Sequence, residues 1–192
     1  YRRAEPLQPA PGLAERAARL LVEADFPLIH AGSGVIHAGA SEELARLADL
    51  LHAPVTTSWA ARGVLAETSA LSWPMVHVKA CNEVRNRADL VLCLGSRLGE
   101  TDWWGKAPYW SRPPEQRMIQ VDVEEEALGR IRPSELAVLA DVKVFLLQLL
   151  ECLEAEKSRI PLQKRKEAVG ALAKGRNEDR ARLDQKLNDL AS

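Results

Sequence analysis

Two kinds of apolar pattern alternate along the chain. Apolar side chains recur every three or four residues in residues 13–24, 41–51, 75–87 and 142–153, and this spacing predicts helices with one buried face. Short continuous apolar runs cover residues 27–31, 54–57, 89–95, 117–123 and 136–140. Runs without alternation are typical of strands in a parallel sheet that is covered on both faces.

The alternation of strands with helices predicts an α/β fold. We expect a doubly wound, mainly parallel, Rossmann-like sheet of six strands. In such sheets, ligands bind beyond the carboxyl ends of the strands. The residues at those ends are therefore the first candidates for a binding site.

Proline and charge divide the chain into three regions. Residues 1–10 form a Pro-rich linker, residues 11–154 a folded domain, and residues 155–192 a charged tail that we expect to be helical. Residues 154–192 carry 10 basic and 7 acidic side chains but few apolar ones. Little apolar area is then available to offset the entropy of ordering. We therefore expect residues 162–192 to be poorly anchored or docked on a neighbouring molecule.

Composition narrows the class of protein. The 192 residues include 26 Lys or Arg and 27 Asp or Glu, so no positive excess favours a nucleic-acid partner. No apolar run reaches the roughly 18 residues of a membrane span. Cys81, Cys93 and Cys152 are widely spaced, which excludes a disulfide scaffold or a paired-cysteine zinc site and suits the cytoplasm. The chain does not begin with Met, and we expect it to be part of a longer protein.

A glycine-rich turn, from Gly32 to Gly34, follows the first predicted strand. Glycines in this position let backbone N–H groups approach a phosphate. A dinucleotide fingerprint needs a third glycine where His37 stands, and an acidic residue at the end of the second strand; both are missing. NAD is therefore disfavoured. A site for another nucleotide phosphate and a turn that needs glycine for steric reasons alone both stay open.

Three charged residues lie where other predicted strands end or where the final helix begins. Arg97 follows the third strand and could pair with a phosphate, a partner carboxylate or a surface side chain. Asp122 ends the fourth strand and could accept hydrogen bonds from ribose hydroxyls or cap the turn after it. Asp141 could contact a ligand, although capping the final helix is the more common role.

Residues 96–116 form a long connection that holds Trp103, Trp104 and Trp110. Long connections are usually functional, and clustered Trp and Arg favour interfaces. The alternative is a loop that folds its aromatic side chains back on its own domain. The sequence shows no catalytic constellation, because its histidines lack metal-ligand spacing and Cys93 is typical of a buried apolar residue. The chain therefore indicates a binding or architectural domain.

Several segments, taken in order, resemble one known family. They are residues 26–35 (FPLIHAGSGV), 40–44 (ASEEL), 52–57 (HAPVTT), 88–97 (ADLVLCLGSR), 118–123 (MIQVDV) and 139–142 (LADV). This set resembles the central domain of thiamine diphosphate-dependent enzymes of the acetolactate synthase and 2-oxoacid decarboxylase group. No single segment is specific, but the ordered set is, and it extends from about residue 11 to residue 154.

The resemblance implies one domain of three in a longer chain. In that family the first and third domains bind thiamine diphosphate and Mg²⁺, the third through a Gly-Asp-Gly motif that this sequence lacks. The central domain binds FAD in some members and ADP in another, and is mainly architectural in others. By this resemblance the ligand-facing positions are Gly32, Gly34, Thr56, Thr57, Arg97, Asp122 and Asp141.

We therefore expect a fragment of a carboligase or decarboxylase that is inactive by itself. Its partners would be the missing N- and C-terminal domains, in a cytoplasmic parent that is a homodimer or homotetramer. Residues 72–75 and 98–104 depart from the family pattern where FAD would lie, so FAD, ADP and no ligand all stay open. The alternative is a stand-alone nucleotide-binding or regulatory module.

Overall fold

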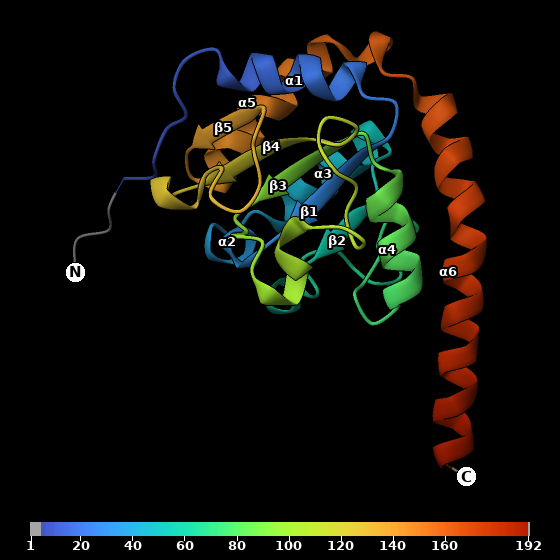
Figure 1. Cartoon of the computed structure of the whole chain (residues 1–192). Coiled ribbons are helices and arrows are strands. Elements are labelled where there is room, and N and C mark those ends of the chain that lie inside the picture. Colours follow the sequence, from blue (N-terminus) through green and yellow to red (C-terminus); the bar gives the residue numbers. More distant parts are fainter. Residues whose placement is uncertain (1–4, 192) are drawn as a thin grey trace.

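The computed structural model describes residues 5–191 and contains one parallel sheet (Figure 1). Its strands are β1 (Pro27–Ala31), β2 (Val55–Thr57), β3 (Leu90–Leu94), β4 (Arg117–Asp122) and β5 (Leu136–Leu139), in the order β2-β1-β3-β4-β5. Every residue of β1, β2 and β3 is buried, as the continuous apolar runs predicted. The α/β class and the parallel sheet are thus confirmed.

The sheet has five strands within the described residues, and the expectation of six was wrong. Beyond the edge strand β2, the chain makes only an isolated bridge between Val55 and Ser72. The N–H of Trp73 donates to the carbonyl of Val55 at 2.9 Å, but Pro74 follows and has no N–H to extend the ladder. The sixth strand is therefore reduced to one bridging residue.

Helices cover both faces of the sheet. They are α1 (Leu13–Glu23), α3 (Ser41–Leu51) and α5 (Val142–Ala155), which pack together, and α4 (Val78–Arg87) with α6 (Leu162–Ala191) beside it (Figure 1). The chain passes from β1 to β2 through α3 and then back to β3 through α4. Right-handed crossovers in opposite directions place these two helices on opposite faces, so the sheet is doubly wound.

The connection between β3 and β4, residues 95–116, contains no α-helix. Trp110 of this loop is fully buried, and the ring of Trp103 stacks on that of Tyr109 at a centroid distance of 4.2 Å. Trp104 stays 45% exposed. The loop therefore folds most of its aromatic side chains back on its own domain, in the place where a helix would otherwise cover the sheet.

Helix α6 is anchored along its first half. The buried Arg165 guanidinium donates to carbonyls at the carboxyl ends of α1 and α3, those of Leu21, Val22, Ala24 and Leu51. Further along, the guanidinium of Arg176 lies 4.9 Å from the ring centroid of Trp73. The expectation of poor anchoring was wrong for this half, because arginine-to-carbonyl contacts take the place of apolar area. Among residues 5–191, no helix combines the length and the apolar composition that a membrane span requires.

Candidate functional site

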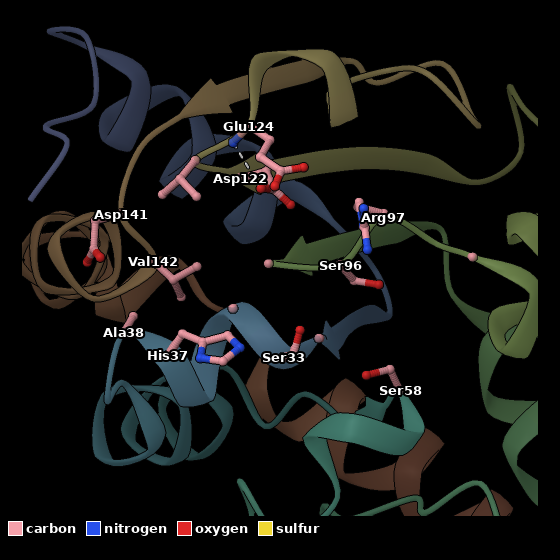
Figure 2. Close-up of a pocket in the computed structure, with 15 residues that line it drawn as sticks. Ser33, His37, Ala38, Ser58, Ser96, Arg97, Asp122, Glu124, Asp141 and Val142 are labelled. Carbon is pink, nitrogen blue, oxygen red and sulfur yellow. Dashed lines mark hydrogen bonds between the residues drawn. The ribbon is translucent and has the colours of Figure 1, made fainter.

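A pocket of about 480 Å³ opens at the carboxyl edge of the sheet (Figure 2). It lies beyond β1, β3 and β4, and strand order reverses between β1 and β3, where ligands bind in open α/β sheets. Its lining residues are Gly32, Ser33, Gly34, His37, Ala38, Ser58, Gly95, Ser96, Arg97, Gly99, Asp122, Val123, Glu124, Asp141 and Val142. The pocket therefore occupies the position that the sequence predicted for a site.

Five of the seven predicted positions line this pocket, namely Gly32, Gly34, Arg97, Asp122 and Asp141. Thr56 and Thr57 do not. Thr56 is fully buried, with Oγ1 3.1 Å from Nδ1 of His30, and Thr57 is only 7% exposed. Ser58 and Ser96 also line the pocket; the strand-end rule covers both, because each directly follows a predicted strand, but the ligand-facing set implied by the resemblance left them out.

The glycines shape the pocket through close backbone packing. The N–H of Gly32 donates to the carbonyl of Leu94 at 2.8 Å, and the N–H of Gly34 donates to the carbonyl of Gly95 at 3.1 Å. A Cβ atom at Gly34 would lie 2.6 Å from the Cα of Gly95, closer than any real contact. Neither N–H is free for a phosphate. The steric interpretation of this turn therefore holds, and α2 (Ser33–His37), which the pattern did not predict, is a single short turn.

One end of the pocket is cationic and rich in hydroxyls. Figure 2 shows Arg97, Ser96 and Ser58 at this end, with Ser33 on the floor between the two ends. Arg97 is exposed, and its guanidinium makes no hydrogen bond or ion pair with the residues that the structure describes. A cation without a partner beside hydroxyl groups suits an anionic group of a ligand.

Acidic side chains lie along another wall. Asp122 is buried, and one of its carboxylate oxygens accepts from the N–H of Glu124 at 3.1 Å. Asp141 accepts from the backbone N–H groups of Lys143 and Val144 at 2.9 and 3.1 Å, and so caps α5. The capping role expected for Asp141 is confirmed. The second carboxylate oxygen of Asp122 accepts no hydrogen bond from the residues that the structure describes.

The cysteines lie away from this chemistry. Cys93 is fully buried within β3, and burial raises the pKa of its thiol far above the usual range. Burial also raises the pKa of Cys81 on α4. Both thiols are therefore protonated at neutral pH and are poor nucleophiles. The described residues hold no group of three or more His, Cys, Asp or Glu side chains that could bind a metal ion.

A doubly wound parallel sheet with a pocket at its carboxyl edge defines the class of this protein as an open α/β domain with a candidate ligand site at the strand ends. Residues 14–149 match the family described as thiamine pyrophosphate enzyme, central domain. The chain belongs to this family, and the resemblance seen in the sequence is confirmed.

Curated relatives agree with this assignment. The chain is 35% identical over 165 residues to a sulfoacetaldehyde acetyltransferase of Castellaniella defragrans, covering 80% of this chain and 27% of the relative. It is 33% identical over 144 residues to an acetolactate synthase of Mycobacterium avium, covering 73% and 22% respectively. The chain thus spans about a quarter of the length of these relatives, which does not favour a stand-alone module.

A solved structure supports the fold. A thiamin diphosphate-dependent enzyme isolated from Mycobacterium smegmatis superposes with a TM-score of 0.64 at 20% identity. The matched part covers 80% of this chain and 30% of that chain. At this level of identity the likeness shows the architecture alone.

Proposed function

We propose that this chain is the central domain of a larger thiamine diphosphate-dependent enzyme, of the acetolactate synthase or sulfoacetaldehyde acetyltransferase kind, that makes or breaks a bond next to a 2-oxo group. The match over residues 14–149, together with the small share of each relative that is covered, carries this proposal. Thiamine diphosphate supplies carbanion-stabilising chemistry where it is bound. Other domains would hold it with Mg²⁺, because this sequence has no Gly-Asp-Gly.

The parent enzyme provides the test of this proposal. We expect its turnover of pyruvate or of sulfoacetaldehyde to require added thiamine diphosphate and Mg²⁺. A parent that consumes neither compound when both cofactors are present would contradict it. A homodimeric or homotetrameric parent in the cytoplasm is part of the same proposal, and three free cysteines agree with a reducing compartment.

Within the parent, the pocket would hold an adenine nucleotide or FAD. Arg97 would contact the phosphates, and the free oxygen of Asp122 would accept from a ribose hydroxyl. At the other end of the pocket, His37 and Val142 offer flat and apolar surface for a base (Figure 2). The fit depends on side chains, since the N–H groups of Gly32 and Gly34 are already bonded within the protein.

Calorimetry with FAD, ADP and NAD on this chain tests the pocket. One charge-assisted contact contributes about 1.5–3 kcal/mol, so Arg97→Ala should weaken binding of ADP or FAD roughly 10- to 150-fold. Arg19→Ala is the matched control, because Arg19 is exposed on α1 away from the pocket. Tightest binding of NAD, or unchanged affinity in Arg97→Ala, would contradict the assigned site. No binding at millimolar concentration would leave the domain purely architectural.

A further inference from the structure

A buried polar cluster lies beneath the loop that connects β3 to β4. Asp102 of this loop is 2% exposed, and its two carboxylate oxygens face different elements. One oxygen lies 3.4 Å from Nε2 of His30 on β1, and the other lies 3.5 Å from a guanidinium nitrogen of Arg85 on α4. The backbone carbonyl of Asp102 also accepts from the indole N–H of Trp110 at 2.9 Å. One residue of the loop is therefore tied to the sheet and to a helix.

Charge balance makes Asp102 hard to replace. Arg85 is fully buried, and its guanidinium carbon lies 4.6 Å and 5.5 Å from the ring centroids of Trp110 and Trp103. Within the described residues, the guanidinium of Arg85 makes no hydrogen bond, and it faces the carboxylate of Asp102. A buried cation that loses its counter-charge is strongly destabilising. Removal of the negative charge at Asp102 should therefore push this side of the loop away from α4.

The loop also needs tertiary contacts to keep its shape. Leu98, Trp103 and Trp104 have φ angles of 49°, 49° and 50°. This left-handed region is unfavourable for residues other than glycine, and such residues persist only where the surroundings hold them. Asp102 lies among these three residues. Its contacts are therefore placed to maintain the backbone between the end of β3 and the buried Trp110.

The same stretch of backbone forms one wall of the pocket. Ser96, Arg97 and Gly99 line the pocket and stand three to six positions before Asp102. We propose that Asp102 is the positioning residue of this wall, since its contacts with His30 and Arg85 fix where Arg97 lies. The effect of Asp102 on ligand affinity depends on the proposed nucleotide site. Its effect on how well the loop is ordered does not depend on that site.

Amide exchange measured by mass spectrometry tests the positioning role without a ligand. In Asp102→Asn, we expect protection of residues 96–104 to fall at least tenfold, while β3 keeps its protection. The double variant Asp102→Asn/Arg85→Met removes both charges and should recover most of that protection. Asp49→Asn, an exposed aspartate on α3, is the matched control and should behave as the wild type. The affinity for ADP should be highest in the wild type and in Asp49→Asn, lower in the double variant and lowest in Asp102→Asn.

Two results would overturn the proposal: unchanged exchange in Asp102→Asn, or a double variant as unprotected as the single one. If Asp102→Asn does not fold, Trp110→Phe replaces it, because this change keeps the carboxylate of Asp102 and removes the indole donor to its carbonyl, together with part of the ring that lies over Arg85. Faster exchange of residues 96–104 in Trp110→Phe would support the proposal, and unchanged exchange would oppose it. If the wild type binds no ADP, the nucleotide site fails while the exchange result still decides the role of Asp102.

Discussion

Gly34 and Gly95 meet backbone to backbone at the floor of the pocket, joined by a 3.1 Å hydrogen bond from the N–H of Gly34 to the carbonyl of Gly95. The contact brings the turn after β1 against the end of β3. It leaves no space for a side chain on either residue, because a Cβ at each position would overlap the backbone of the other.

Gly34→Ala should destabilise the fold. Forcing a methyl group against backbone atoms typically costs about 1–3 kcal/mol, and the carbonyl and Cα of Gly95 cannot move without shifting β3. Urea unfolding would show this loss as a lower midpoint. Gly170→Ala in α6 is the control, where no atom lies within 4 Å of an added Cβ and alanine should stabilise the helix by roughly 0.5–1 kcal/mol. Equal midpoints for Gly34→Ala and the wild type would contradict the prediction.

Arg165→Met should release the start of α6 and lower stability. Burial lowers the pKa of Arg165 to about 10, so the side chain is still cationic at neutral pH. It satisfies carbonyls at the ends of two helices, and its loss should cost about 3 kcal/mol, the order of a hydrogen-bonded buried charge. Lys164→Ala, which removes only an exposed pair with Asp25, should change the urea midpoint little.

Thiol alkylation should distinguish the three cysteines. Burial raises the pKa of all three thiols, but Cys152 is only half-buried, whereas Cys81 and Cys93 are enclosed and closed to a reagent. Iodoacetamide at pH 8 should therefore modify Cys152 alone in the folded chain and all three residues in urea. Rapid labelling of Cys93 without denaturant would contradict the burial of β3.

Acid should weaken the fold partly through Asp102. Burial alone would raise the pKa of this carboxyl group, but the neighbouring His30 and Arg85 outweigh burial and hold it below the ordinary value of 3.8. The native state then binds fewer protons than the unfolded chain. The contribution of Asp102 to the free energy of unfolding is therefore fully present above the unfolded pKa of 3.8 and is lost as the pH falls through the lower pKa of the folded state. Urea unfolding at pH 5, 4 and 3 should show a steeper loss for the wild type than for Asp102→Asn/Arg85→Met.

This chain by itself should not turn over 2-oxo acids with thiamine diphosphate and Mg²⁺. In the proposed function, other domains of the parent hold the cofactor, and no Gly-Asp-Gly occurs in this sequence. Carbon dioxide release from pyruvate, compared with a sample without protein, provides the measurement. Release above that background would show that a complete site exists within the 192 residues.

Much of the fold was predictable because buried parallel strands have a distinctive pattern. The runs that became β1 and β3 are apolar without alternation, and the carboxyl ends of such strands meet at one edge. This rule is enough to bring Arg97 and Asp122 into one pocket. It could not predict which strand-end side chains face a ligand, and so it also selected Thr56, which is turned toward His30 instead.

Other features depended on contacts between distant residues that follow no periodic pattern. His30, Arg85 and Asp102 lie on a strand, a helix and a loop, and no spacing along the chain links them. The anchoring of α6 escaped prediction for a similar reason. Arg165 looks like one more charge in a charged tail until the carbonyls that it binds are in view.

The contacts of Arg165 have a consequence for where this domain ends as a folding unit. The family match stops at residue 149, yet Arg165 closes the ends of α1 and α3 from a helix that starts at Leu162. The first turns of α6 then cannot detach without exposing the carbonyls at the ends of α1 and α3. These turns should therefore unfold together with the sheet in one cooperative transition. A truncation at the family boundary would remove part of the domain's own structure, and a shortened chain that folds as well as this one has to keep α6 at least as far as Arg165.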